Sequence, residues 1–147
     1  MIQPSLLMHY LINLFCMIIE NLNVMLKIRP YESRDEKKII SLWKACNLTV
    51  PWNDPKKDIL RKMVFDPELF FVGVIEAKIV GTCMAGYDGH RGSIFYLGVT
   101  PELQKKGIAR KLVNHAEKAL LKLGCPKINL MVRKTNKNVI QFYQSIG

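Results

Sequence analysis

Hydrophobic and polar positions along the chain change their period several times, and each change marks a predicted element. Residues 26–30 alternate in the manner of a short strand that ends at a proline. Residues 32–47 then carry apolar side chains at helical spacing, behind an S-x-x-E capping-box pattern formed by Ser33 and Glu36. The first part of the pattern therefore predicts a strand followed by a helix.

A second helix is predicted within residues 50–66. Asp54 suits the N-cap position and Pro55 suits the first helical position, where a missing N–H costs nothing. The apolar side chains expected to face inward are Ile59, Leu60, Met63 and Val64.

From residue 69 the pattern shifts to β-branched and aromatic runs. The runs predict strands at about 69–75, 79–87 and 93–99, separated by turn residues and joined as a meander. A helix is then expected from residue 108 to about Leu123, ended by Gly124.

The last part of the pattern predicts two short elements. Residues 127–133 alternate as a strand, and residues 136–147 have the spacing of a short helix. No internal repeat or low-complexity linker interrupts this order.

Residues 1–24 stand apart because the stretch from Leu6 to Ile19 is almost wholly apolar. It lacks the basic region and cleavage site of a signal peptide, and it is shorter than the ~18 apolar residues of a membrane span. Met25 opens a region with the texture of an ordinary domain. We therefore interpret residues 1–24 as an extension, from an upstream start or an added helix, and residues 25–147 as the domain; no membrane partner is expected.

Charge and cysteine content narrow the picture further. The 147 residues include 22 Lys and Arg against 12 Asp and Glu, a net charge of +10, which favours an acidic partner such as nucleic acid, an anionic membrane or a phosphorylated cofactor. The four cysteines and three histidines lack zinc-site spacing, so no metal is expected. Thiols in a chain with an ordinary core indicate a reducing, cytoplasmic setting.

Residues 104–109, QKKGIA, lie where a predicted strand gives way to a helix. The first N–H groups of a helix have no partner inside it, and that end carries partial positive charge. Gly107 lets the backbone approach a ligand, while Lys105 and Lys106 add charge suited to a pyrophosphate. On these six residues alone, a solvated surface loop is the simpler interpretation, and no P-loop or dinucleotide glycine pattern is present.

The order of the elements adds weight to this turn. The pattern [QR]-x-x-G-x-[GA] is the signature of the GCN5-related N-acetyltransferase (GNAT) family, and Gln104, Gly107 and Ala109 match it. Residues 26–147 resemble this family, and PWNDP, GYDGHRGS, YLGV and GCPKI resemble the YpeA-type bacterial acetyltransferases most. The resemblance implies an α/β (α+β) fold with a mixed, mostly antiparallel central sheet flanked by helices, and acetyl-CoA as acetyl donor.

The resemblance also assigns residues to the cofactor. In the family the strand before the turn splays at a bulge and contacts the pantetheine arm; Leu97, Gly98 and Val99 match that place. Glycine inside a strand often marks a bulge or a close backbone approach, which agrees with Gly98. The resemblance assigns the pyrophosphate to backbone N–H groups of Gln104, Lys105, Lys106, Gly107, Ile108, Ala109 and Arg110.

Catalytic roles follow from the same resemblance. The amide N–H of Val99 would polarise the thioester carbonyl. Asn136 and Tyr143 match the family's N-x6-Y helix, with Asn136 near the pantetheine arm and Tyr143 near the sulfur. A tyrosine with the reference pKa of ~10 keeps its proton at neutral pH and can give it to a departing thiolate.

The acceptor side is less defined. The predicted strand before the turn has no carboxylate to serve as the general base that many family members carry there. Three alternatives stay open: proton transfer through water to Asp88, transfer through His90, or loss of the proton before binding. Arg91 would hold an acceptor carboxylate, and Trp52 and Asn53 are assigned to the acceptor side together with His90 and Arg91.

The family usually continues beyond SIG with two further strands that wall the acceptor site, so these C-terminal strands are expected to be missing. That leaves open a truncated enzyme, a homodimer that lends strands through an exposed sheet edge, and acetyl-CoA binding without turnover.

The leading hypothesis is an N-acetyltransferase that moves acetyl from acetyl-CoA to a primary amine by direct attack in a ternary complex. The alternatives are a catalytically weak acetyl-CoA-binding or regulatory module and a basic nucleic-acid-binding domain. The sequence has no DNA- or RNA-binding motif, so no nucleic-acid partner is expected.

Overall fold

The computed structural model describes residues 4–132, 134 and 136–147, which form a mixed α/β fold around one sheet. Within these residues the strand order is β1-β2-β3-β4-β5, antiparallel from β1 to β4 and parallel between β4 and β5. The predicted mixed, mostly antiparallel sheet is confirmed. The strands are β1 (Lys27–Pro30), β2 (Phe70–Ile75), β3 (Lys78–Tyr87), β4 (Gly92–Val99) and β5 (Ile128–Asn129).

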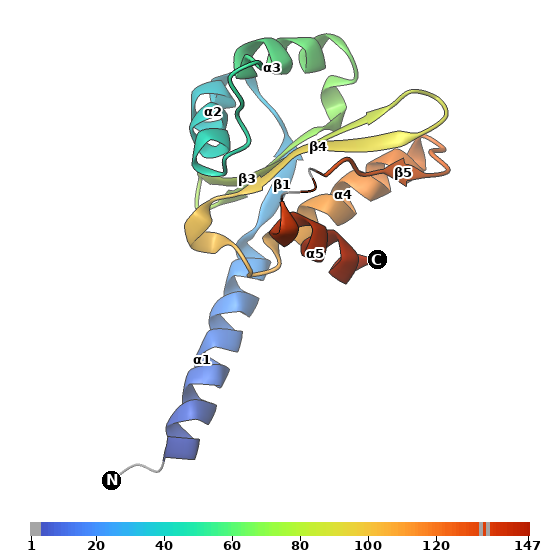
Figure 1. Ribbon diagram of the computed structural model, residues 1–147. Helices are drawn as coiled ribbons and strands as arrows, with labels where there is room; N and C mark the ends of the chain where they lie inside the picture. Colours follow the sequence, from blue (N-terminus) through green and yellow to red (C-terminus); the bar gives the residue numbers. More distant parts are fainter. Residues whose placement is uncertain (1–3, 133, 135) are drawn as a thin grey trace.

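Helices cover both faces of this sheet (Figure 1). On one face lie α2 (Glu36–Ala45) and α3 (Pro55–Val64), and on the other lie α4 (Ile108–Lys122) and α5 (Lys137–Ile146). Short 3-10 turns precede α2, β2 and α4: η1 (Ser33–Asp35), η2 (Pro67–Leu69) and η3 (Pro101–Leu103). The sheet therefore separates two cores.

The α4 face holds the larger core. The apolar stripe of α4 packs against β2, β3 and β4, where Leu112 and Leu120 are fully buried. A stripe at this spacing is what an amphipathic helix needs to cover a sheet. Gly124, with φ at +79°, follows the helix as predicted, since glycine adopts this left-handed backbone without a Cβ clash.

The α2 face is built around an aromatic cluster. Trp43 of α2 is fully buried and lies beside Phe70 of β2 and Tyr96 of β4, with ring centroids 6.1 and 3.8 Å away. Tyr31 also stacks on Phe70, at 4.7 Å. Stacked rings of this kind add to the free energy gained by burial alone, so the cluster fixes α2 against the sheet.

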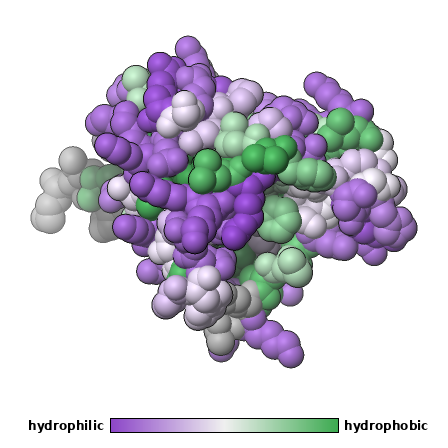
Figure 2. Space-filling model, turned by 90° about the horizontal axis from the view of Figure 1, so that it is seen from above, coloured by the Kyte–Doolittle hydropathy of each residue, from purple (hydrophilic) through white to green (hydrophobic). Residues whose placement is uncertain are grey.

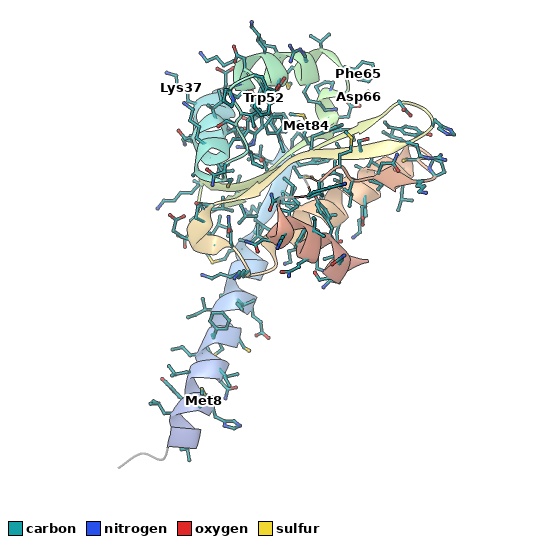
Figure 3. All side chains as sticks on the ribbon, in the orientation of Figure 1. Met8, Lys37, Trp52, Phe65, Asp66 and Met84 are labelled. Atoms are coloured by element: carbon teal, nitrogen blue, oxygen red, sulfur yellow. The ribbon has the colours of Figure 1, made fainter. Side chains whose placement is uncertain are left out.

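The N-terminal segment forms α1 (Pro4–Met25), which projects away from the sheet as a single rod (Figure 1). Most of its described apolar side chains are exposed, as Figure 3 shows for Met8 near the free end. Among the described residues, no helix combines the length and the apolar character needed to cross a membrane. Residues 1–3 of the predicted extension lie outside the described part of the chain.

Most predicted elements are confirmed, with boundaries shifted by a residue or two. The last strand is shorter than expected, because only Ile128 and Asn129 of residues 127–133 pair with β4; Arg133 lies outside the described residues. The capping box of Ser33 and Glu36 is wrong. Asp35 takes that role one residue earlier, accepting a hydrogen bond from the Glu32 N–H at 2.9 Å.

The inward face of α3 also differs from the prediction. Asp54 caps the helix through the N–H groups of Lys56 and Lys57, as expected, but Leu60 and Val64 are 61% and 87% exposed. Lys62 is buried in their place. The reason is the position of α3, which contacts α2 and η2 rather than the middle of the sheet, so that only a narrow stripe of it is covered.

Close packing between β3 and α4 makes Gly81 sensitive to substitution. A Cβ there would lie 2.8 Å from the Leu112 side chain and 3.0 Å from the Gly98 carbonyl oxygen. We predict that Gly81→Ala lowers the free energy of unfolding by about 1–3 kcal/mol, the usual cost of overpacking a core. Urea denaturation measures this change.

Gly86→Ala, on the same strand, is the matched control. Its Cβ would meet only a Phe95 ring carbon at 3.4 Å, an ordinary contact distance, so it should change stability little. Equal losses from Gly81→Ala and Gly86→Ala would contradict the packing argument.

Candidate functional site

A β-bulge in β4 is the central feature of the site. Thr82 pairs with Gly98 and Met84 pairs with Phe95, so that two β4 residues, Tyr96 and Leu97, oppose the single residue between them on β3. Tyr96 has φ at +48°, which redirects the strand. A bulge bends its strand and re-aims the side chains there.

Buried polar contacts hold this bulge in place. The Thr82 hydroxyl accepts a hydrogen bond from Trp43 Nε1 and donates one to the Tyr96 carbonyl oxygen, both at 2.9 Å. Thr82 and Trp43 are fully buried, and the Trp43 ring stacks on the Tyr96 ring. Because an unpaired buried hydroxyl costs free energy, these contacts favour one backbone path through the bulge.

Beyond the bulge, β4 presents backbone groups without a strand partner. The ladder to β5 includes only Gly92 and Ser93, and the part of β4 that follows them has no neighbour on that edge among the described residues. The Thr100 N–H bonds to the Val80 carbonyl at 2.8 Å, which makes Val99 and Gly81 a pair without mutual hydrogen bonds. The Val99 N–H therefore points away from β3, toward the open side.

The turn that follows leads directly into α4. Gln104 donates through Nε2 to the Val99 carbonyl at 3.0 Å, which ties the turn back to the strand. Lys105 and Gly107 both have positive φ, +59° and +85°, and backbone of alternating φ sign forms concave N–H arrays that bind anions. No side chain caps the start of α4, so the first backbone N–H groups of this helix have no side-chain acceptor.

The remaining turn residues surround this helix end. Ile108 is buried and anchors the helix in the core, whereas Ala109 is half-buried and Arg110 is exposed. Lys106 donates through Nζ to the Glu102 carbonyl at 3.3 Å. Lys106 therefore adds positive charge next to the start of α4, where the helix dipole is also positive.

Asn136 and Tyr143, at the start of α5 and within it, are the remaining residues predicted for the cofactor side. Asn136 caps α5, its Oδ1 accepting from the Val139 N–H at 3.4 Å. Tyr143 is half-buried against the core that contains Cys83, the β3 residue opposite the bulge. Burial, followed by the proximity of Cys83, raises the pKa of Tyr143 to about 12, so its hydroxyl keeps its proton at neutral pH.

Gly98 has an additional structural reason to be glycine. A Cβ there would lie 2.8 Å from the Leu48 side chain and 3.4 Å from that of Leu42. The close approach predicted for this residue therefore includes packing against α2 and the segment that follows it.

A pocket of about 560 Å³ opens on the opposite face of β4. It lies between α3 and the β3–β4 hairpin, on the face that Figure 2 views, where an apolar band crosses a mostly polar surface. Tyr96 reaches it from the bulge, and its hydroxyl donates to Asp58 Oδ2 of α3 at 2.5 Å. Burial, then Asp58, raises the pKa of Tyr96 to about 12.

The residues predicted for the acceptor side divide between this pocket and the solvent. Asn53 and Arg91 line the pocket, and Asn53 also contacts the Tyr96 hydroxyl. Trp52 is 76% exposed and His90 is exposed, and neither is among the lining residues. Figure 3 shows Trp52 between α2 and α3.

Asp88 serves the hairpin turn. Its Oδ1 accepts from the backbone N–H groups of His90 and Arg91, both at 2.7 Å, and these bonds lower the pKa of Asp88. Gly89 has φ at +89°, as a tight turn requires.

Asp58, Lys62 and Tyr96 line the pocket but were not among the site residues predicted from the sequence. Asp58 and Lys62 read as ordinary polar positions of a helix, and Tyr96 lies 38 residues from the carboxylate that it contacts. The i, i+4 spacing of Asp58 and Lys62 is the one signal that places them on a shared face.

Comparison with known proteins identifies relatives of this arrangement. The sequence model described as the acetyltransferase (GNAT) family matches residues 37–147. Acetyltransferase ECA0875 of Pectobacterium atrosepticum is 49% identical over 121 residues, which cover 82% of this chain and 86% of that protein.

Solved structures share the fold. Ard1 from Thermoplasma volcanium superposes with a TM-score of 0.71 at 21% identity, over 84% of this chain and 82% of that one. The NatC complex bound to Gag peptide and CoA includes a chain with a TM-score of 0.67 at 24% identity, over 83% of each.

The hydroxyl of Thr82 should be essential to the bulge. We predict that Thr82→Val, which keeps the shape and removes the hydroxyl, lowers the free energy of unfolding by about 1–3 kcal/mol, because Trp43 Nε1 loses its buried acceptor. Thr49→Val, at a half-buried position between α2 and α3, is the control. An unchanged urea midpoint for Thr82→Val would contradict this role.

Proposed function

The chain belongs to the acetyltransferase (GNAT) family and is an N-acetyltransferase that uses acetyl-CoA; from this premise we propose which residues carry the transfer. The observation that supports the assignment most is the path of β4, which leaves its neighbour after Ser93 and runs into an uncapped helix end. We propose transfer to a primary amine by direct attack in a ternary complex.

The open side of β4 fits a pantetheine arm, and the start of α4 fits a pyrophosphate. Leu97 and Val99 offer strand backbone on the open edge, and Gly98 lies between them. Asn136, the N-cap of α5, is proposed to contact the same arm, as the resemblance to the family implies. The pyrophosphate would be bound by the N–H groups of Gln104, Lys105, Lys106, Gly107, Ile108, Ala109 and Arg110, with the two lysines as countercharge.

Two residues are proposed to act on the reacting atoms. When bound, acetyl-CoA supplies the acetyl group as a thioester. The Val99 N–H donates to the carbonyl oxygen and stabilises the charge that grows there. As the bond from nitrogen to carbon forms and the bond from carbon to sulfur breaks, Tyr143 gives its proton to the sulfur.

The pocket on the α3 face is proposed as the acceptor site, because Tyr96 of the bulge lines it and the same bulge lies on the open edge of β4. Asn53 and Arg91 line it, whereas Trp52 and His90, predicted for the same side, are exposed and lie outside its lining. The acceptor would reach the thioester at the bulge itself.

Several broader assignments belong to the same proposal. Residues 25–147 would form the acetyltransferase domain, with residues 1–24 outside it, since α1 projects from the sheet. A cytoplasmic location is proposed from the free thiols, including the exposed Cys16. A homodimer through the sheet edge at β5 is proposed because that edge leaves most of β4 unpaired.

Gly107 gives a test of the cofactor site. We predict that Gly107→Ala weakens acetyl-CoA binding at least about tenfold, because a Cβ at φ +85° strains the turn by roughly 1–2 kcal/mol and displaces its N–H groups. A thermal-shift titration with acetyl-CoA measures the affinity.

Gly124→Ala is the matched control, since Gly124 has φ at +79° at the other end of the same helix. It should lose similar stability and keep its affinity. Parallel losses of affinity in both variants would argue against a local role for Gly107.

Tyr143 gives a test of the acid. We predict that Tyr143→Phe lowers kcat by roughly 10²- to 10⁴-fold, the usual contribution of a general acid, while the affinity for acetyl-CoA stays within about twofold. Thiol release across a panel of amines measures kcat. Tyr31→Phe, on the opposite face of the sheet, is the control, and full turnover by Tyr143→Phe would refute the assignment.

A further inference from the structure

The pocket on the α3 face has the dimensions and the lining of a small-molecule site. Its volume of about 560 Å³ lies within the usual range for ligand pockets. Phe65, Met84 and Phe95 supply apolar walls from three different elements, and Figure 3 shows Phe65 at the end of α3 above Met84 on the sheet. These walls suit an apolar body of modest size.

A carboxylate lies in this pocket beside the bulge. Asp58 has a side chain only 17% exposed, and Tyr96 donates to its Oδ2 from the bulge itself. Since the pKa of Tyr96 is raised to about 12, that hydroxyl remains a donor and leaves the negative charge on Asp58. A cationic group bound to Asp58 would therefore lie next to the place where the thioester is proposed to bind.

The existing cationic partner of Asp58 is readily displaced. Arg61 bonds to Asp58 Oδ1 at 2.5 Å, but its side chain is 72% exposed. Ion pairs with so much solvent contact contribute little stability, typically below about 1 kcal/mol. A ligand ammonium can replace Arg61 at small cost.

Lys62 supplies the complementary charge. It lies one helical turn after Asp58, lines the same pocket and is only 9% exposed. It takes part in none of the ion pairs formed by the described residues. Burial lowers the pKa of Lys62, and the charges of Asp66 and Glu68 partly oppose this shift. A buried cation without a bonded partner is costly unless a ligand anion reaches it.

The pocket's other carboxylate is occupied. Asp88 accepts two backbone N–H bonds in the hairpin turn, whereas Arg91 adds a further cation to the lining. The pocket thus offers one carboxylate beside the bulge and an excess of cations around it, which matches a ligand that carries both charges.

Resting on the acetyltransferase function proposed above, we propose that the acceptor is a free amino acid with an apolar side chain, its ammonium bound by Asp58 and its carboxylate by Lys62. The ammonium loses two protons in the reaction. One would pass through Asp58 to solvent before nitrogen attacks. The other would leave the nitrogen after attack and replace the proton that Tyr143 gives to the sulfur, so that the products are the N-acetyl amino acid, the free thiol and one proton.

Matched acceptors test the carboxylate contact. Phenylalanine and phenylalaninamide share the apolar body and differ in the carboxylate and in the basicity of the amino group. At a pH where both amines are mostly protonated, thiol release should give a kcat/KM roughly ten- to a hundredfold higher for phenylalanine, the range of a charged hydrogen bond. Lys62→Met should abolish this preference. Lys57→Met, an exposed position on the same helix with the same loss of charge, should keep it.

Asp58→Asn tests the ammonium contact through its pH dependence. Its kcat/KM at pH 7 should fall at least about tenfold, and the deficit should shrink as the pH rises past the pKa of the acceptor's amino group, which for a free amino acid is higher than the ~8 of a peptide N-terminus. A purely structural loss would be equal at every pH. The titratable and charged groups that share the pocket with Asp58 are Arg61, Lys62, Tyr87, Asp88, Arg91 and Tyr96.

The outcomes separate the two proposals. If acetyl-CoA fails to stabilise the chain in a thermal shift, the proposed cofactor site is wrong. If the chain shows no turnover, the thermal shift that each acceptor causes in the CoA-saturated chain still measures the preference for phenylalanine over phenylalaninamide. Equal response to phenylalanine and phenylalaninamide, or a preference that survives Lys62→Met, overturns the amino-acid assignment while leaving the acetyltransferase function intact.

Discussion

The hydrogen bond from the Thr82 hydroxyl to the Tyr96 carbonyl is the contact on which the rest of the site depends. It lies in a fully buried position and is completed by Trp43, which donates to the same hydroxyl and stacks on the Tyr96 ring. A bulge costs ladder hydrogen bonds, so it persists only where other contacts satisfy the displaced groups. Here α2 and β3 supply those contacts.

The bulge in β4 lies between two different surroundings, an open strand edge and a pocket. Toward the α4 side, β4 has already left β5 after Ser93, and the strand beyond the bulge has unpaired backbone groups that lead to the uncapped helix end. On the α3 side, Tyr96 enters a pocket that holds a carboxylate. A single backbone distortion would therefore place the proposed acetyl-CoA site and the proposed acceptor site on either side of one strand.

Much of this fold was predictable because its elements have distinct periods. The stripe of α4 and the three central strands were read within a residue or two, since each buries one continuous face. The prediction was wrong for Leu60 and Val64, which have the spacing of an inward face but lie where no sheet covers α3. Periodicity specifies which residues share a face, whereas the extent of burial depends on packing far away in the sequence.

The proposed site could be inferred from the sequence only where its residues form a local motif. The turn at Gln104 to Arg110 is such a motif, because backbone N–H groups at a helix start need only the right residues in sequence. The partnership of Asp58 with Tyr96 has no such motif, since it joins α3 to a bulge 38 residues later. The absence of a carboxylate on β4 therefore did not mean the absence of one beside the bulge. A strand that turns a tyrosine toward a neighbouring helix can recruit the carboxylate from there, so that in the proposed acceptor site α3, rather than the sheet, would bind the charged group of the acceptor.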